Sequence, residues 1–127
     1  MDIETALKAL TLQNAPIAAA FGQRYYIDRI PDNVIYPIIR AVTVSDSQQD
    51  THTGTWGILA TVQLDIWDDD KQGCNVNAEK VKDWLHRYKG AFGTGEATIK
   101  IRNAPSVPDP DTRLFRKILE VDMLITI

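Results

Sequence analysis

The acidic run at residues 68–73 has the spacing of a calcium-binding loop. Asp68, Asp70 and Gln72 alternate, Gly73 follows, and Glu79 stands at the twelfth position. In a calcium loop, alternating oxygens and a turn glycine surround the cation, and the last glutamate binds it with both oxygens. Gln72 departs from the usual Asp or Asn, and a strand-like pattern precedes the run where an EF-hand needs a helix. We therefore interpret these carboxylates as stabilising a helix N-terminus, and we predict no metal and no cofactor.

The single cysteine and the two histidines lack the partners that catalysis or metal binding requires. Cys74 follows a glycine at the start of a predicted helix, where a thiolate is favoured, but no histidine with catalytic context lies near it. His52 and His86 have no partner at ligand spacing, so we predict both to be surface residues. The serines have no nucleophile context either: Ser45, Ser47 and Ser106. We predict a protein that is not an enzyme.

Two short patterns imitate nucleic-acid and nucleotide motifs. Residues 84–90, W-L-H-R-Y-K-G, mix aromatic and basic side chains as base-stacking surfaces do. Trp84 and Tyr88 nevertheless fall on the apolar stripe of a predicted helix, which places them in the core. The glycines at 90, 93 and 95 follow a helix and lead into a strand, the reverse of the order that phosphate binding needs.

The totals bound the class of protein. A chain of 127 residues is long enough for one domain, residues 1–127, with a core of its own. The net charge of −3 gives no support to a general nucleic-acid affinity. Residues 1–70 hold ten acidic and four basic residues, whereas residues 71–127 hold seven acidic and ten basic ones. This asymmetry either attracts neighbouring copies or simply marks two solvated faces. We expect no signal peptide, no internal disulfide and no membrane span.

A long alternating strand must position everything else. In residues 55–67, T-W-G-I-L-A-T-V-Q-L-D-I-W, the even positions are apolar and share one face of an extended strand. Residues 34–44 are rich in β-branched side chains and predict its neighbour, which starts late or lies at an open edge because of Pro37. The polar residues 45–54 are expected to form a long hairpin tip.

Helices are expected to cover the apolar face of this strand. Residues 2–12 and 17–21 predict two short helices, with Asp2 as a cap and Pro16 in a first turn. Residues 75–89 predict an amphipathic helix, which Asp70 can also start earlier, ending at Gly90. Its core-facing lid residues are Val81, Trp84, Leu85 and Tyr88.

Short strands complete the predicted sheet. They are residues 25–27, 97–102 and 114–127, with a turn at residues 91–96 and a proline-rich loop at 103–111. The predicted fold class is α+β, with a mainly antiparallel sheet, a long hairpin and one face covered by helices.

The order of these pieces resembles a known family. The matching segments run from A-L-K-A-L and A-A-A-F-G-Q-R-Y-Y, followed by I-P-D, to V-I-Y-P-I-I-R-A-V and T-V-Q-L-D-I-W-D-D-D. The segments V-N-A-E-K-V-K-D-W-L and R-L-F-R-K-I-L-E-V-D-M-L-I-T-I complete the pattern over nearly the whole chain. It is similar to the tail-completion, or tail-terminator, proteins of long-tailed bacteriophages, which join head and tail.

The resemblance implies a structural virion protein. Six copies would form a ring that caps the tail tube, contacts the tube protein and the head connector or stopper, and lets DNA pass. Assembly would occur in the host cytoplasm, with the protein at the neck end of the tail, and no membrane involved. The residues that we assign to the subunit interface or the lumen are Asp46, Gln48, Gln49, Asp50, His52, Asp68, Asp69 and Asp70. The alternative is a monomeric or dimeric ligand-binding or regulatory module of the same architecture.

Overall fold

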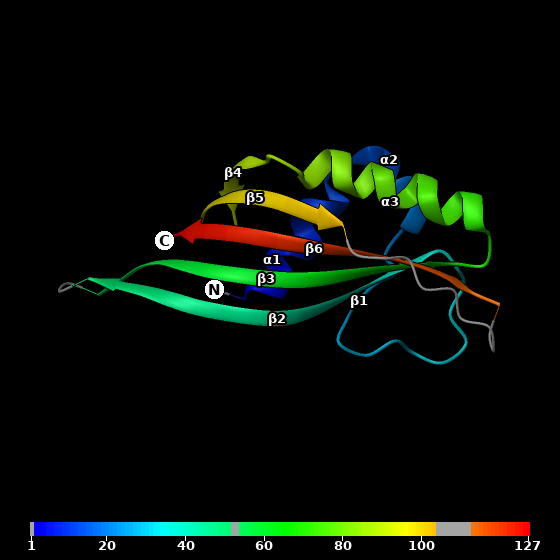
Figure 1. The fold of residues 1–127 in the computed structure, drawn as a ribbon, viewed down its shortest axis with the longest axis horizontal. Coiled ribbons are helices and arrows are strands. Elements are labelled where there is room, and N and C mark those ends of the chain that lie inside the picture. The colour runs from blue at the N-terminus through cyan, green and yellow to red at the C-terminus, as the bar shows by residue number, and fades with distance from the viewer. Residues whose placement is uncertain (1, 52–53, 104–112) are drawn as a thin grey trace.

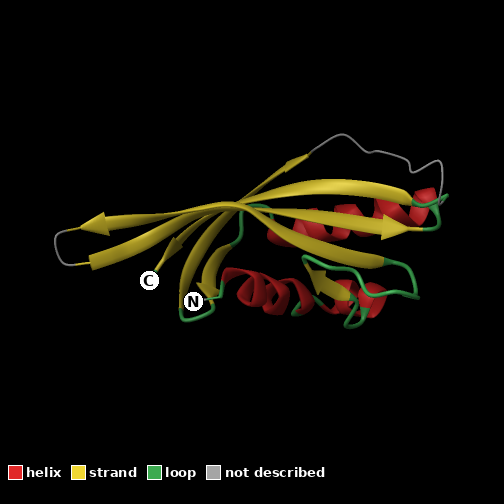
Figure 2. Cartoon of the chain, turned by 90° about the horizontal axis from the view of Figure 1, so that it is seen from below, coloured by secondary structure: helices red, strands yellow, loops and turns green. Residues whose placement is uncertain are grey.

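The computed structural model describes residues 2–51, 54–103 and 113–127, which form helices packed on a mixed β-sheet. The sheet has six strands in the order β1-β2-β3-β6-β5-β4. The helices lie against one face of this twisted sheet (Figures 1 and 2). The elements are α1 (Ile3–Leu12), α2 (Ala15–Phe21), β1 (Tyr25–Ile27), β2 (Ile38–Thr51), β3 (Gly54–Asp68), α3 (Lys71–Leu85), β4 (Lys89–Phe92), β5 (Gly95–Asn103) and β6 (Phe115–Thr126).

The α+β class agrees with the sequence prediction, and the sheet is mixed. β1 runs parallel to β2, and residues 28–37 between them bring the chain back to the end of the sheet at which β1 starts. The other pairings of the described strands are antiparallel. The mostly antiparallel prediction therefore holds apart from the short β1 edge.

β3 lies at the centre of the core. Its even residues from Ile58 to Ile66 are at most 8% exposed, as the period of two predicts. Trp56 is an exception, with 44% of its surface exposed. β6 ends at Thr126, which pairs with Gly57. Trp56 therefore lies outside the part of β3 that pairs with β6.

Side-chain caps begin the helices, at Asp2 as predicted and at Asn14, which starts α2 two residues before the predicted Ile17. Asp2 Oδ1 accepts a hydrogen bond from the Thr5 backbone N–H at 3.2 Å, and Asn14 Oδ1 accepts one from Ile17 at 3.2 Å. Asp70 Oδ2 accepts from Gly73 at 2.8 Å. The earlier of the two predicted starts for α3 is therefore correct.

The predicted end of α3 at Gly90 is wrong, because the chain leaves the helix at His86. His86 has an extended backbone, and its Nδ1 accepts a hydrogen bond from the Ile101 N–H at 3.0 Å. The Arg87 N–H donates to the Ile99 carbonyl at 2.9 Å. These bonds tie residues 86–88 to β5, so His86 is half-buried rather than a plain surface residue.

The predicted polar loop at residues 45–54 is also wrong. β2 continues to Thr51 and β3 starts at Gly54, so the hairpin is almost entirely paired. The side chains on both faces of this part of β2 are polar and mostly exposed, so the sequence shows no alternation of apolar and polar residues there. β2 starts late, at Ile38, directly after the cis Tyr36–Pro37 bond. The predicted turn at 91–96 holds β4 and the start of β5, and the loop at 104–111 lies outside the described residues.

α3 lies over the helix-facing side of β3 and β6 (Figure 1). Val81 and Leu85 are fully buried in the core, and Trp84 and Tyr88 pack against it. The Trp84 Nε1–H donates to the Leu10 carbonyl at 2.9 Å, which joins α3 to α1. The helices are thus fastened to each other as well as to the sheet.

Truncating the buried side of α3 tests this packing. Leu85→Ala is expected to lower the free energy of unfolding by about 2–5 kcal/mol, since it leaves a cavity under the helix. Val76→Ala on the same helix, at a side chain that is 47% exposed, is expected to change it by no more than about 0.5 kcal/mol. Urea denaturation measures both, and equal losses would show that α3 is not held by its buried side.

Candidate interaction surfaces

The calcium-like spacing is used to start a helix. Asp68 is 6% exposed, and its Oδ1 accepts from the Asp70 N–H at 3.3 Å, while Asp70 caps α3. A Cβ on Gly73 would lie 2.8 Å from Asp68 Oδ2 and 3.0 Å from Asp70 Oδ2, so only glycine lets both carboxylates approach. Burial raises the pKa of Asp68. Within the described residues, no three His, Cys, Asp or Glu side chains are grouped to hold a metal ion.

Cys74 has the surroundings of a structural thiol. It is 2% exposed, and its Sγ donates toward the Ile66 carbonyl at 3.3 Å and lies 3.6 Å from that of Phe115. Burial raises its pKa to about 11, and the negative charge of Asp68 adds to the effect. The thiol therefore stays protonated at neutral pH, which opposes nucleophilic chemistry.

The residues assigned to an interface or lumen separate into two groups at opposite ends of the hairpin. Four lie on the far half of β2, and three lie at the end of β3 or directly after it. Residues 46–50 are opposite residues 55–60 of β3, which at about 3.3 Å per residue is roughly 25–45 Å from Asp68. The β2 group is Asp46, Gln48, Gln49 and Asp50, the other group is Asp68, Asp69 and Asp70, and His52 lies outside the described residues.

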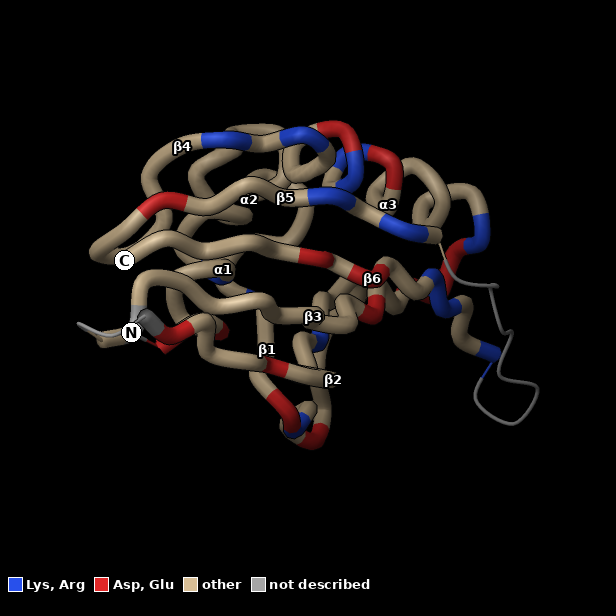
Figure 3. The backbone as a smooth tube through the Cα atoms, turned by 60° about the vertical axis from the view of Figure 1, so that its left-hand side comes forward, with Lys and Arg blue, Asp and Glu red and all other residues tan. Residues whose placement is uncertain are grey.

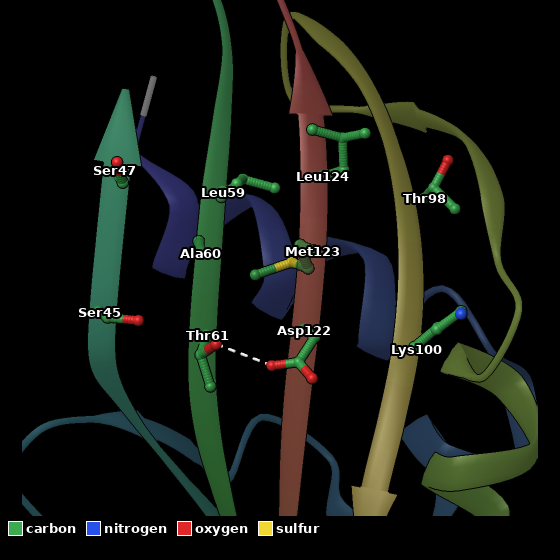
Figure 4. Close-up of a pocket in the computed structure, with 10 residues that line it drawn as sticks. All are labelled: Ser45, Ser47, Leu59, Ala60, Thr61, Thr98, Lys100, Asp122, Met123 and Leu124. Carbon is green, nitrogen blue, oxygen red and sulfur yellow. Dashed lines mark hydrogen bonds between the residues drawn. The ribbon is translucent and has the colours of Figure 1, made fainter. Parts of the chain in front are cut away.

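The sheet face away from the helices carries a hollow that the sequence analysis missed. This open-face groove has a volume of about 420 Å³, and Figure 4 shows it with the helices behind the strands. Two apolar side chains stand in it, Leu59 at 47% and Leu124 at 38% exposure. Its lining comes from β2, β3, β6 and β5: Ser45, Ser47, Leu59, Ala60, Thr61, Thr98, Lys100, Asp122, Met123 and Leu124.

An ion pair lies along one side of the open-face groove. Arg102 Nε donates to Asp122 Oδ2 at 2.5 Å, and Arg102 Nη2 lies 2.9 Å from Glu120 Oε2. The Thr61 hydroxyl donates to Asp122 Oδ1 at 2.7 Å (Figure 4). The hydrogen bond from Arg102 lowers the pKa of Asp122, and that from Thr61 adds to it. The carboxylate in the groove is thus already neutralised.

A second charged cluster closes the other end of the same face. Asp65 is fully buried, with Arg116 Nη2 at 3.1 Å and Arg40 Nη1 at 3.8 Å from its Oδ2. Gln63 Nε2 donates to Asp65 Oδ1 at 2.9 Å. The Arg116 guanidinium also lies over the Trp67 ring, 5.2 Å from its centroid. Because this carboxylate is paired and hydrogen-bonded, its burial is tolerated.

The two edges of the sheet differ in sequence and charge. β1 pairs with β2 only over Ile39–Ala41, so no described strand pairs with the outer edge of β2 beyond it. The opposite edge is β4, whose outer side has no described strand either. Lys and Arg gather around β4, β5 and α3, whereas acidic positions mark α1 and β2 (Figure 3). No helix in the described part of the chain is long and apolar enough to span a membrane.

The chain belongs to the tail completion protein gp17 family, whose model matches residues 5–126. This agrees with the resemblance found in the sequence segments.

Among solved structures, the chain is similar to one from the virion of a native gene transfer agent particle. The two share 17% sequence identity with a TM-score of 0.70, and the match covers 98% of each chain. At this identity the likeness establishes the fold. No curated protein sequence matches the chain.

The Arg102–Asp122 pair predicts acid sensitivity. The pKa of Asp122 is lower in the folded chain than its usual value of 3.8, so the pair stabilises fully above that pH and is lost as pH falls through the folded pKa. Asp122→Asn is expected to be less stable than the parent at neutral pH, and the difference is expected to shrink in acid. Urea denaturation from pH 7 to pH 3 measures it.

The partner residue supplies the control. Arg102→Gln is expected to remove the same pH dependence, and the double variant is expected to add little further. A pH-independent difference between Asp122→Asn and the parent would contradict the assignment.

Proposed function

We propose that this chain is a structural virion protein whose copies form a six-membered ring that caps the tail tube and joins it to the head connector. DNA passes through the ring without sequence-specific binding. The partners are the tube protein, the connector or stopper protein and other copies of the chain. The protein acts at the neck end of the tail after assembly in the host cytoplasm, and family membership over residues 5–126 is the observation that carries this proposal.

The surfaces support a ring. A heterologous interface brings one patch of a subunit against a different patch of the next, and it closes when the rotation between copies divides a full circle. The open edge of β2 and the edge formed by β4 are such unlike patches. Their opposite charge favours contact between copies over contact of either patch with itself.

The rival function is a ligand-binding or regulatory module. The volume of the open-face groove, about 420 Å³, favours this second function because it is within the range of small-molecule sites. However, the groove lies across exposed strands with two leucines half-open to solvent, whereas ligand sites bury most of their ligand. A protein surface suits it better.

The mass in solution and the phenotype of particles separate these functions. Six copies of a 14.3 kDa chain give about 86 kDa by light scattering, whereas the rival function requires a monomer or dimer. Particles assembled without the chain are expected to show overlong tails or unjoined heads and tails by electron microscopy. Normal particles without the chain would refute the proposal, whatever the mass in solution.

The acidic end after β3 is proposed to face the lumen or its rim. Asp69 and Asp70 are exposed there, whereas Asp68 is buried. Carboxylates repel DNA phosphates and so keep DNA from binding during passage. The β2 group, from Asp46 to Asp50 with His52, is assigned to contacts between subunits.

Neutralising this end tests the assignment. The variant Asp69→Asn with Asp70→Asn keeps the cap of α3, since asparagine caps about as well as aspartate. Assembly is expected to be normal and DNA ejection slower, with a stronger effect at low salt. Lys80→Gln with Glu79→Gln, on exposed positions of α3, is the control. Unchanged ejection kinetics at every salt concentration would remove the lumen assignment.

A further inference from the structure

The far half of the hairpin exposes apolar residues at two irregular positions. This hairpin arm comprises residues 44–51 of β2 and 54–58 of β3. The β2–β3 register skips Val44 between Thr43 and Ser45, and it skips Trp56 between Thr55 and Gly57. Each skipped residue is a bulge, and bulges re-aim side chains. Val44 is 60% exposed and Trp56 is 44% exposed, so both bulges present an apolar side chain to solvent.

The hairpin arm is anchored at its base and projects at its tip. The Ile127 N–H donates to the Trp56 carbonyl at 3.1 Å, which fixes Trp56 beside the chain end. Beyond that point β2 and β3 pair only with each other, and Figure 1 shows the hairpin extending past β6. A two-stranded ribbon of this kind is marginally stable in water, so a binding surface that covers it would stabilise it.

The open-face groove has the complementary chemistry. Leu59 and Leu124 supply apolar surface, and Lys100 stands at the β5 side (Figure 4). Asp122 in the groove is paired with Arg102, whereas Lys100 forms no ion pair among the described residues. Lys89 and Thr98 line a smaller hollow of about 160 Å³ that shares Leu124 with the groove. The groove therefore offers an apolar floor with Lys100 at its border, while the smaller hollow has both Lys89 and the acidic Glu96 in its lining.

The charge of the hairpin indicates that this segment can occupy the open-face groove. Residues 41–64 contain no lysine or arginine, and Asp46 and Asp50 are their acidic residues. Asp46 is exposed near Asp2 and Glu4 of the N-terminal helix, so the base of the hairpin arm is acidic as well. An acidic segment that carries an exposed tryptophan fits a groove with an apolar floor and Lys100 at its border.

We propose that the hairpin arm of each copy lies in the open-face groove of the next copy, with Trp56 against Leu59 and Leu124 and with Asp46 near Lys100. This inference rests on the proposed ring and adds to the contact between sheet edges a second contact between neighbouring copies. The arm contributes Trp56 and Asp46, whereas the groove contributes Leu59, Leu124 and Lys100, so the contact is heterologous and propagates from copy to copy. Ser45 and Ser47 of the arm line the groove of their own chain.

Site-directed disulfide formation in assembled particles tests the contact. Asp46 and Lys100 lie on β2 and β5, which are three strand spacings apart in the sheet order, roughly 14 Å. That separation prevents a disulfide within one chain. The variant Asp46→Cys with Lys100→Cys is therefore expected to give a ladder of covalent oligomers on oxidation. Asp69→Cys with Lys100→Cys, which uses the opposite end of the hairpin, is the matched control and is expected to give none.

Charge reversal supplies a second readout. Asp46→Lys and Lys100→Asp are each expected to raise the dissociation constant between copies by about tenfold or more, and the double reversal is expected to restore most of the affinity. Trp56→Ala is expected to weaken the contact similarly, whereas Val76→Ala, at a side chain of similar exposure on α3, is not.

The outcomes separate this inference from the ring itself. Intact rings without a ladder, or without rescue by the double reversal, would overturn the arm–groove contact and leave the ring proposal standing. If Lys100→Asp weakened binding to purified tail tubes while ring mass stayed unchanged, the groove would bind the tube protein and the inference would be wrong. The absence of rings in particles would overturn both proposals.

Discussion

The burial of one face of β3 is the constraint on which the rest of the structure depends. Five even residues from Ile58 to Ile66 must be kept from water, and each large apolar side chain among them gains about 1.5–3 kcal/mol on burial. A helix cap contributes about 1 kcal/mol. Burial therefore decides where the helices lie, and the caps at Asp2, Asn14 and Asp70 decide where each helix begins.

β6 is shorter than β2 and β3, and this mismatch leaves surfaces available to partners. β2 and β3 extend beyond the end of β6, so the hairpin arm projects. None of the described helices covers the other face of the sheet (Figure 2), so its side chains are polar, paired or exposed. Asp65 and Asp122 are polar and paired with arginines, whereas Leu59 and Leu124 are apolar and remain exposed. An interaction surface thus follows from the same strand that organises the core.

The sequence predicted the parts of the fold that repeat a strong local pattern. The alternation in β3 and β6 and the cap at Asp2 can be predicted correctly because each depends on neighbouring residues. Asp70 was the second of two possible starts for α3. The far half of β2 was read as a loop because its residues are polar on both faces, and its strand state is set by pairing with β3. The end of α3 was misplaced because His86 is held by Ile101, fifteen residues away.

The open-face groove was beyond sequence reasoning for a related reason. Leu59 and Leu124 were visible as apolar residues on the polar faces of their strands, but single exposed leucines are ordinary. They become a surface only because Leu59 and Leu124 are direct partners in the β3–β6 register. The buried Asp65 cluster then fills one end of the face and the Arg102–Asp122 pair borders the middle. The apolar surface is confined in this way to the end nearest the hairpin arm.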